Sequence, residues 1–135
     1  MNFDKILSPL SPYFLALLRV VSGLLFLEHG TQKILHFPVS DFHPPIFSLL
    51  GAAGILELVG GVLIILGLFT RPAAFILSGQ MAFAYFMMHA PNSVFPALNG
   101  GDAAILFCFI FLFMVFAGPG KFSLDGKRKA LRHSY

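Results

Sequence analysis

Four strongly apolar blocks follow one another along the chain, separated by short segments rich in proline, glycine and polar residues. Each block is close to the roughly 20 residues that a helix needs to cross the hydrocarbon core, because a helix rises about 1.5 Å per residue. The pattern therefore predicts an all-α integral membrane protein, a bundle of four transmembrane helices. The predicted spans are Tyr13–Leu35, Pro45–Phe69, Pro72–Ala90 and Asp102–Ala117.

The segments between the blocks contain residues that end helices. Residues 36–45 read "HFPVSDFHPP", and three prolines cannot continue a helix. Arg71 and Pro72 indicate a tight turn, because proline suits the first turn of a new helix. Asp102 follows two glycines and is expected to be the N-cap of the last span, which "GPG" at 118–120 ends. The chain thus divides into an N-terminal segment (1–12), one transmembrane domain (13–117) and a basic tail (118–135).

Composition agrees with a membrane protein. Hydrophobic residues make up 57% of the 135 residues and charged residues only 11%, against roughly 25% charged in an ordinary soluble domain. Such a chain could not cover itself with a polar surface. The first block is interpreted as a retained span rather than a secretory signal, because only Lys5 precedes it and no small-residue cleavage site follows it.

Lysine and arginine are distributed unevenly between the two predicted sides of the membrane. Cytoplasmic loops carry an excess of these residues, so the side that holds both termini is predicted to be cytoplasmic. Only Lys33 lies on the opposite side. The cations on the terminal side are Lys5, Arg71, Lys121, Lys127, Arg128, Lys129 and Arg132.

The formal net charge of +3 comes mostly from the tail, "KFSLDGKRKALRHSY". A basic run beside a span meets anionic lipid headgroups more often than nucleic acid, so the bilayer is the expected partner and nucleic-acid binding is not expected. Cys108 is the only cysteine, which excludes an intramolecular disulfide and a CxxC redox pair. A buried structural thiol is expected there.

Three polar residues are predicted to form a layer deep in the membrane. Counted from the cytoplasmic ends of their helices, Arg19 lies roughly 12 Å deep, Gln80 roughly 14 Å and Glu57 roughly 20 Å. An isolated charge at this depth is costly and usually faces a partner or a cavity. We therefore expect an ion pair between Arg19 and Glu57, bridged through Gln80. Its purpose is either to fix helix register or to take part in ligand binding or proton movement.

A second polar layer is predicted at the outer end of the bundle. Gln32 and Lys33 could simply extend to the headgroups, but His29 lies deeper, and His89 reaches a similar depth on another helix. We interpret these histidines as part of a site. Haem ligation by the two rings, or a zinc or copper site with Glu28, stay as alternatives without a supporting local motif, and no metal is assigned. The layer is completed by Asn99 and Asp102.

Glycines recur on two faces of the second span. Gly54 and Gly61 are seven residues apart, as are Gly60 and Gly67. Small residues let helix backbones approach closely within a membrane, so a packing role is favoured over close approach to a ligand.

Three separated motifs in this order resemble the DoxX family of small four-helix membrane proteins. They are "LLRVVSGLLFLEHGTQKI" (17–34), "ELVGGVLIILGLFTRPAA" (57–74) and "NGGDAAILFCFIFLFMVFAGPGKFSLD" (99–125). The resemblance implies a bacterial inner-membrane protein related to the small subunit of thiosulfate:quinone oxidoreductase. Some members are described as membrane partners in redox complexes that handle sulfur compounds or oxidative stress.

The family pattern falls on most of the candidate polar residues. It places the first-span arginine and the second-span acid at Arg19 and Glu57, "HG" at His29 and Gly30, and "QK" at Gln32 and Lys33. Glu28 does not belong to it. The remaining matches are "GG" at Gly60 and Gly61, Arg71, "NGG" with its acid at Asn99 to Asp102, and "GPGKFSLD".

These observations lead to one preferred function and two alternatives. The preferred hypothesis is a quinone-linked oxidoreductase subunit in which His29, Glu57 and Arg19 serve catalysis, while Gln32, Lys33, Gln80, His89, Asn99 and Asp102 serve binding. The chain has no evident electron carrier, so soluble redox partner proteins are expected, and a homo-oligomer stays open. The alternatives are a non-catalytic anchor that recruits soluble redox enzymes through its tail, and a small transporter or channel.

Overall fold

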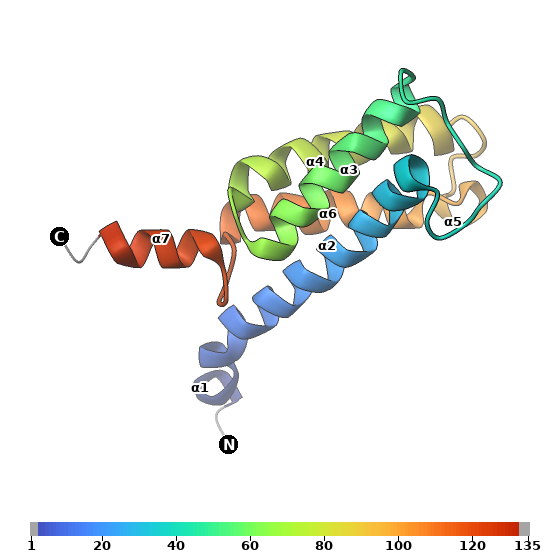
Figure 1. Cartoon of the computed structure of the whole chain (residues 1–135). Helices are drawn as coiled ribbons and strands as arrows, with labels where there is room; N and C mark the ends of the chain where they lie inside the picture. Colours follow the sequence, from blue (N-terminus) through green and yellow to red (C-terminus); the bar gives the residue numbers. More distant parts are fainter. Residues whose placement is uncertain (1–2, 133–135) are drawn as a thin grey trace.

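The computed structural model describes residues 3–132, and all regular structure within this range is helical. Four helices pack together into one bundle, as Figure 1 shows: α2 (Ser11–Leu35), α3 (Leu49–Leu66), α4 (Thr70–Ala84) and α6 (Asp102–Ala117). The all-α prediction is therefore confirmed for the described residues. The short elements are α1 (Phe3–Leu7), a 3₁₀ turn (Ser8–Leu10), a π-helical segment (Tyr85–His89), α5 (Pro96–Asn99) and α7 (Leu124–Arg132). Residues 1–2 and 133–135 of the predicted terminal segments lie outside the described range.

The helices coincide with the four predicted blocks, with shifts at their ends. Phe3–Leu35 and Leu49–Leu66 are long and apolar enough to cross a bilayer, whereas α6 is apolar but shorter. The second helix begins at Leu49 instead of Pro45, because Ser48 caps it by accepting a hydrogen bond from Gly51 N at 3.1 Å.

The N-cap predicted at Asp102 is wrong. Helix α6 begins at Asp102 itself, Gly101 takes the cap position, and no side chain caps this end. The Gly101 N–H donates a hydrogen bond to Asn99 Oδ1, at 2.8 Å. Asp102 consequently lies in the first turn, where a carboxylate is favoured by the helix dipole without capping the helix.

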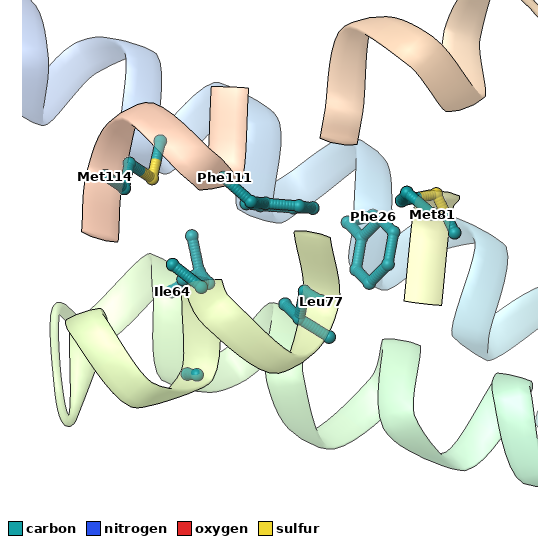
Figure 2. Packing of buried hydrophobic residues seen from close by; sticks show 8 residues of the cluster. Phe26, Ile64, Leu77, Met81, Phe111 and Met114 are labelled. Atoms are coloured by element: carbon teal, nitrogen blue, oxygen red, sulfur yellow. The ribbon is translucent and has the colours of Figure 1, made fainter. Parts of the chain in front are cut away.

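The hydrophobic core lies where α2, α3, α4 and α6 meet. Figure 2 shows Phe26, Ile64, Leu77, Met81, Phe111 and Met114 packed together. The Phe26 ring meets the Phe111 ring edge-on, with the two centroids 4.9 Å apart. Many other large apolar side chains point outward from the long helices, which suits helices that face lipid.

Glycines allow close contact between α2 and α3. A Cβ on Gly30 would lie 2.5 Å from Leu58 N, and one on Gly61 would lie 2.9 Å from Leu27 Cα. Neither position can take a side chain without moving backbone, so the packing role expected for glycine in this span is confirmed at Gly61. Gly67 differs, since it lies beyond the end of α3 with a φ of +62°.

Candidate functional site

A pocket of about 720 Å³ lies at one end of the bundle. The described part of the chain begins and ends near the opposite end of the bundle, as Figure 1 shows. The C-terminal half of α2, the N-terminal half of α3, the C-terminal part of α4 with the π-helical segment, and the start of α6 form the walls of the pocket. The walls are mainly apolar and aromatic, as in most small-molecule sites. Among the side chains that line it are Phe26, Leu50, Met81, Met87, Ala104 and Phe107.

A buried ion pair forms the polar part of this pocket. Lys33 Nζ lies 2.6 Å from both carboxylate oxygens of Glu57, whose side chain is only 4% exposed. Gln80 Nε2 donates to Glu57 Oε1 and to Ala53 O, each at 3.3 Å. Because both neighbours of this nitrogen are acceptors, the orientation of the Gln80 amide is fixed. The carboxylate thus has the charged partner and the hydrogen bonds that a buried acid requires.

The predicted ion pair between Arg19 and Glu57 is wrong, and helix register is the reason. Antiparallel packing places Gly30 of α2 against Leu58 of α3. Arg19, near the other end of α2, reaches Gly67, which is ten residues beyond Glu57 and thus about 15 Å away along the helix. Lys33, which is predicted as a binding residue of the outer polar layer, is therefore the partner of Glu57.

Arg19 instead binds the segment that follows the last long helix. Its side chain is fully buried, and its Nη2 donates to Phe122 O at 2.9 Å and to Lys121 O at 3.4 Å. Gly67 leaves room for the guanidinium, because a Cβ there would collide with Arg19 Nη1. Arg19 does not line the pocket, so the structure separates it from His29 and Glu57, the other two predicted catalytic residues.

Asp125, which the sequence analysis missed, holds the same segment to the start of α4. Its carboxylate accepts hydrogen bonds from Phe69 N at 2.9 Å and Thr70 N at 2.8 Å, and its own N–H donates to Gly67 O at 2.9 Å. Partial burial opposes ionisation, but these hydrogen bonds and the positive charge of Arg128 outweigh it, so the pKa of Asp125 is lowered. The motif "GPGKFSLD" is therefore a docking segment for the base of the bundle.

Two further contacts connect chain segments at the base of the bundle. The Arg71 guanidinium donates to Phe116 O at 2.8 Å and also to Val115 O, which are carbonyls of the last turn of α6. Such carbonyls have no partner within the helix. Lys121 N donates to Pro12 O at 3.0 Å, which brings the start of α2 beside the segment after α6.

His29 and His89, which are predicted at a similar depth on separate helices, both line this pocket. The His29 ring lies edge-on to Phe107, with centroids 6.4 Å apart. His89 ends the π-helical segment, in which Ala90 N donates to Tyr85 O at 2.9 Å, and its Nδ1 lies 3.0 Å from Asn99 O. Within residues 3–132, no three histidine, cysteine or acidic side chains come together as metal ligands.

The other three predicted binding residues do not line the pocket. Asn99 is buried, and its Nδ2 donates to Ser93 O at 2.8 Å and to the Tyr85 hydroxyl at 3.3 Å, so it shapes the loop before α6. Gln32 is half-buried and Asp102 is exposed, both away from the pocket walls. Sequence depth alone could not distinguish these residues from Lys33 and His29.

The pocket reaches the outer face of the bundle between α3 and α4. Several residues line it and are also exposed, which opens it sideways. Gly79 lines the pocket and is exposed, and a Cβ built there would have no atom within 4 Å. Gly79 is not among the predicted site residues. Exposed residues of α3 and α4 that line the pocket include Ala52, Leu56, Ile76, Gly79 and Phe83.

Comparison with known proteins identifies the family. The model of the DoxX family matches residues 14–90, more than half of the chain. The chain belongs to the DoxX family. A Haemophilus influenzae protein is 49% identical to it over 125 residues, covering 86% of this chain and 91% of that protein. A Mycobacterium tuberculosis membrane protein is 26% identical over 153 residues, covering 92% and 86% respectively.

No solved structure matches this DoxX chain. Its two long apolar helices and its similarity to a membrane protein identify it as a membrane protein. The DoxX match includes Lys33, Glu57, Gln80 and both pocket histidines, whereas Asp125 lies beyond it.

Proposed function

We propose that this DoxX protein is a quinone-binding membrane subunit of a redox complex. In this proposal α2, α3, α4 with its π-helical extension, and α6 all cross the inner membrane of a bacterial cell, with both termini in the cytoplasm. One observation carries the functional part: a roomy apolar pocket is built around the partnered carboxylate of Glu57. It would lie at the outer end of the membrane domain.

The residues of the pocket fit a quinone. A quinone needs an apolar slot for its ring and tail, and hydrogen-bond donors at its carbonyl oxygens. Aromatic and methionine side chains supply the slot. Lys33 has three N–H donors, of which two meet Glu57, so a third is left for a ligand. His29 and His89 add imidazoles, the side chains whose ordinary pKa is nearest neutrality and which are suited to exchanging protons.

The sideways opening supports entry of a lipid-soluble ligand. A quinone with a long apolar tail resides in the bilayer and would reach the pocket between α3 and α4. The opening is lined by the apolar side chains of Leu56, Ile76 and Phe83. A quinone tail that contacts them would stay out of water as it enters the pocket.

Electron transfer would require a partner. A bound quinone would supply the electron-accepting chemistry, while the chain has one cysteine and no flavin fingerprint with which to deliver electrons. In this proposal the protein binds the quinone, excludes water from it and handles protons at Glu57, His29 and His89. A soluble redox protein delivers the electrons.

Purification in a mild detergent followed by solvent extraction tests the proposal. We expect quinone to copurify with the protein, and a decyl-benzoquinone to bind saturably to the extracted protein. The double variant Lys33→Met with Glu57→Gln removes the ammonium donor that is left for a ligand and leaves no unpaired buried charge, so it should weaken this binding by about tenfold, the loss expected for one charge-assisted hydrogen bond. Phe75→Leu, at an exposed position outside the pocket, is the matched control on α4. Absence of both copurified quinone and saturable binding would exclude a quinone site.

A further inference from the structure

Helix α7 presents a strongly cationic surface at the base of the bundle. All of its positively charged side chains are exposed. Its one acid, Asp125, is held by the Phe69 and Thr70 N–H groups and offsets only one of the four positive charges, so the helix keeps a net positive charge. The cations of the helix are Lys127, Arg128, Lys129 and Arg132.

The position of α7 is set by the docking segment and not by packing along the long helices. Phe122 O is held by Arg19, and the Asp125 carboxylate is held at the start of α4. Figure 1 shows α7 extending away from the bundle base. Because α6 ends at Ala117 and α7 begins at Leu124, the helix lies within a few residues of the end of an apolar helix. In a membrane protein this is the level of the headgroups.

Apolar and aromatic side chains are exposed at the same end. Phe122 is 80% exposed and Leu131 is 64% exposed. The Arg128 guanidinium lies over the Phe69 ring at 5.1 Å, and Lys121 Nζ lies 5.8 Å from the centroid of Tyr13. Cations combined with exposed aromatic and aliphatic groups are typical of segments that lie in the membrane interface.

From these observations we infer that α7 is a docking surface for the anionic phospholipid headgroups of the bilayer. Polybasic helices beside a span are attracted to anionic lipid by charge, and the exposed apolar side chains enter the interface. The docking segment connects this contact to the bundle, because the same residues partner the buried Arg19 and cap α4. Anionic lipid therefore stabilises the fold through α7. This inference is independent of what the pocket binds.

A tryptophan reporter tests the contact, since the natural chain contains no tryptophan. The Leu131→Trp protein is placed in nanodiscs of phosphatidylcholine alone, or with 30% phosphatidylglycerol. We expect a blue-shifted emission, quenched by lipids with brominated chains, in the anionic discs and a much weaker effect in the neutral ones. High salt should reverse it, because exposed charges are screened.

Neutralising the helix provides the second measurement. The triple variant Lys127→Gln, Lys129→Gln and Arg132→Gln should abolish the dependence on phosphatidylglycerol in the reporter protein. In the protein without the reporter, anionic lipid should raise the thermal unfolding midpoint by several degrees, and the same triple variant should remove this rise. Lys5→Gln, which removes one cation from the N-terminal segment, is the control for a general charge effect.

Three results would overturn the inference. One is a reporter emission that is the same in both kinds of nanodisc. Another is a phosphatidylglycerol effect that persists in the triple variant, because other surfaces would then be responsible. The third is an emission shift that requires an added acidic protein and not anionic lipid, which would assign α7 to a protein partner.

Discussion

Lys33 Nζ lies 2.6 Å from both carboxylate oxygens of Glu57, and this ion pair connects α2 to α3 inside the pocket. Gly30, one turn earlier on α2, lies against the backbone of Leu58. The absence of a side chain at Gly30 therefore lets the helices approach closely enough for Lys33 to reach the acid. Charge pairing and helix packing are two parts of the same contact.

Glu57→Gln should destabilise the protein by on the order of 3 kcal/mol, because it leaves the Lys33 ammonium largely enclosed without a counter-charge. The double variant Lys33→Met with Glu57→Gln should recover much of this loss, since it removes the unpaired charge. Unfolding of each variant by SDS titration from mild detergent gives the comparison. Equal stability of Glu57→Gln and the wild type would show that the pair contributes nothing to the fold.

Gly30→Ala should cost about 1–3 kcal/mol, the usual cost of overpacking a tight interface. Its Cβ would lie 2.5 Å from Leu58 N, so the backbones of α2 and α3 must move apart. Gly79→Ala is the matched control, because it adds the same methyl group to a helix where nothing lies within 4 Å. Thermal unfolding should show a large loss at Gly30 and none at Gly79, and equal effects would contradict the register described above.

Gly79→Phe should narrow the opening between α3 and α4 and slow or weaken quinone binding by about tenfold or more, while the unfolding midpoint stays unchanged. The reason is that the substituted ring occupies open space on the proposed entry route. Binding of decyl-benzoquinone to the purified variant checks this, with Phe75→Leu as the control. Unaltered binding would place the entry route elsewhere.

Asp125→Ala should destabilise the protein by about 1–2 kcal/mol, as expected for the loss of a helix cap. The start of α4 then loses the partner of the Phe69 and Thr70 N–H groups. Asp102→Ala is the control, because it removes an aspartate from a helix start where that aspartate makes no capping hydrogen bond. It should lower the free energy of unfolding by less than about 1 kcal/mol. Chemical unfolding in detergent compares the two, and similar losses would contradict the capping role of Asp125.

Acid should weaken the attachment of the docking segment. Because the pKa of Asp125 is lowered in the fold, its contribution to stability is present above the ordinary aspartate range, near pH 4, and is lost as the pH falls through the lowered pKa. The wild type should therefore lose its stability advantage over Asp125→Ala progressively as the pH falls below about 4. Unfolding midpoints of both proteins across this range provide the measurement, and a constant difference would contradict the prediction.

The helices themselves could be predicted from apolar block length, because helix rise and bilayer thickness fix how many consecutive apolar residues are needed. The pocket could be predicted in part. His29 and His89 were placed at one depth on separate helices, and both line it. Depth could not reveal that Asn99 bonds within its own loop, or that Gly79 lies at an opening, because depth gives no information about which side of a helix faces a neighbour.

The partners of the buried charged residues could not be predicted from the sequence. Arg19 and Glu57 have opposite signs and lie on neighbouring helices, which made their pairing the simplest prediction. The observed partners of Arg19 are backbone carbonyls more than 100 residues away, and Asp125 caps a helix that begins 55 residues before it. Contacts at such separations depend on where each helix ends and how the next segment returns.

By itself, then, the sequence determined the helical class, the approximate positions of the four bundle helices and the polar residues that need partners, since these follow from local hydrophobicity and from the cost of burying charge. Only the tertiary structure decided which partner each residue takes. Close glycine contacts set the register of α2 against α3, and this register brings Lys33 within ion-pair distance of Glu57. Arg19 then forms its hydrogen bonds with the segment after α6. A shift along a helix of a few residues changes every such pairing without altering the apolar pattern.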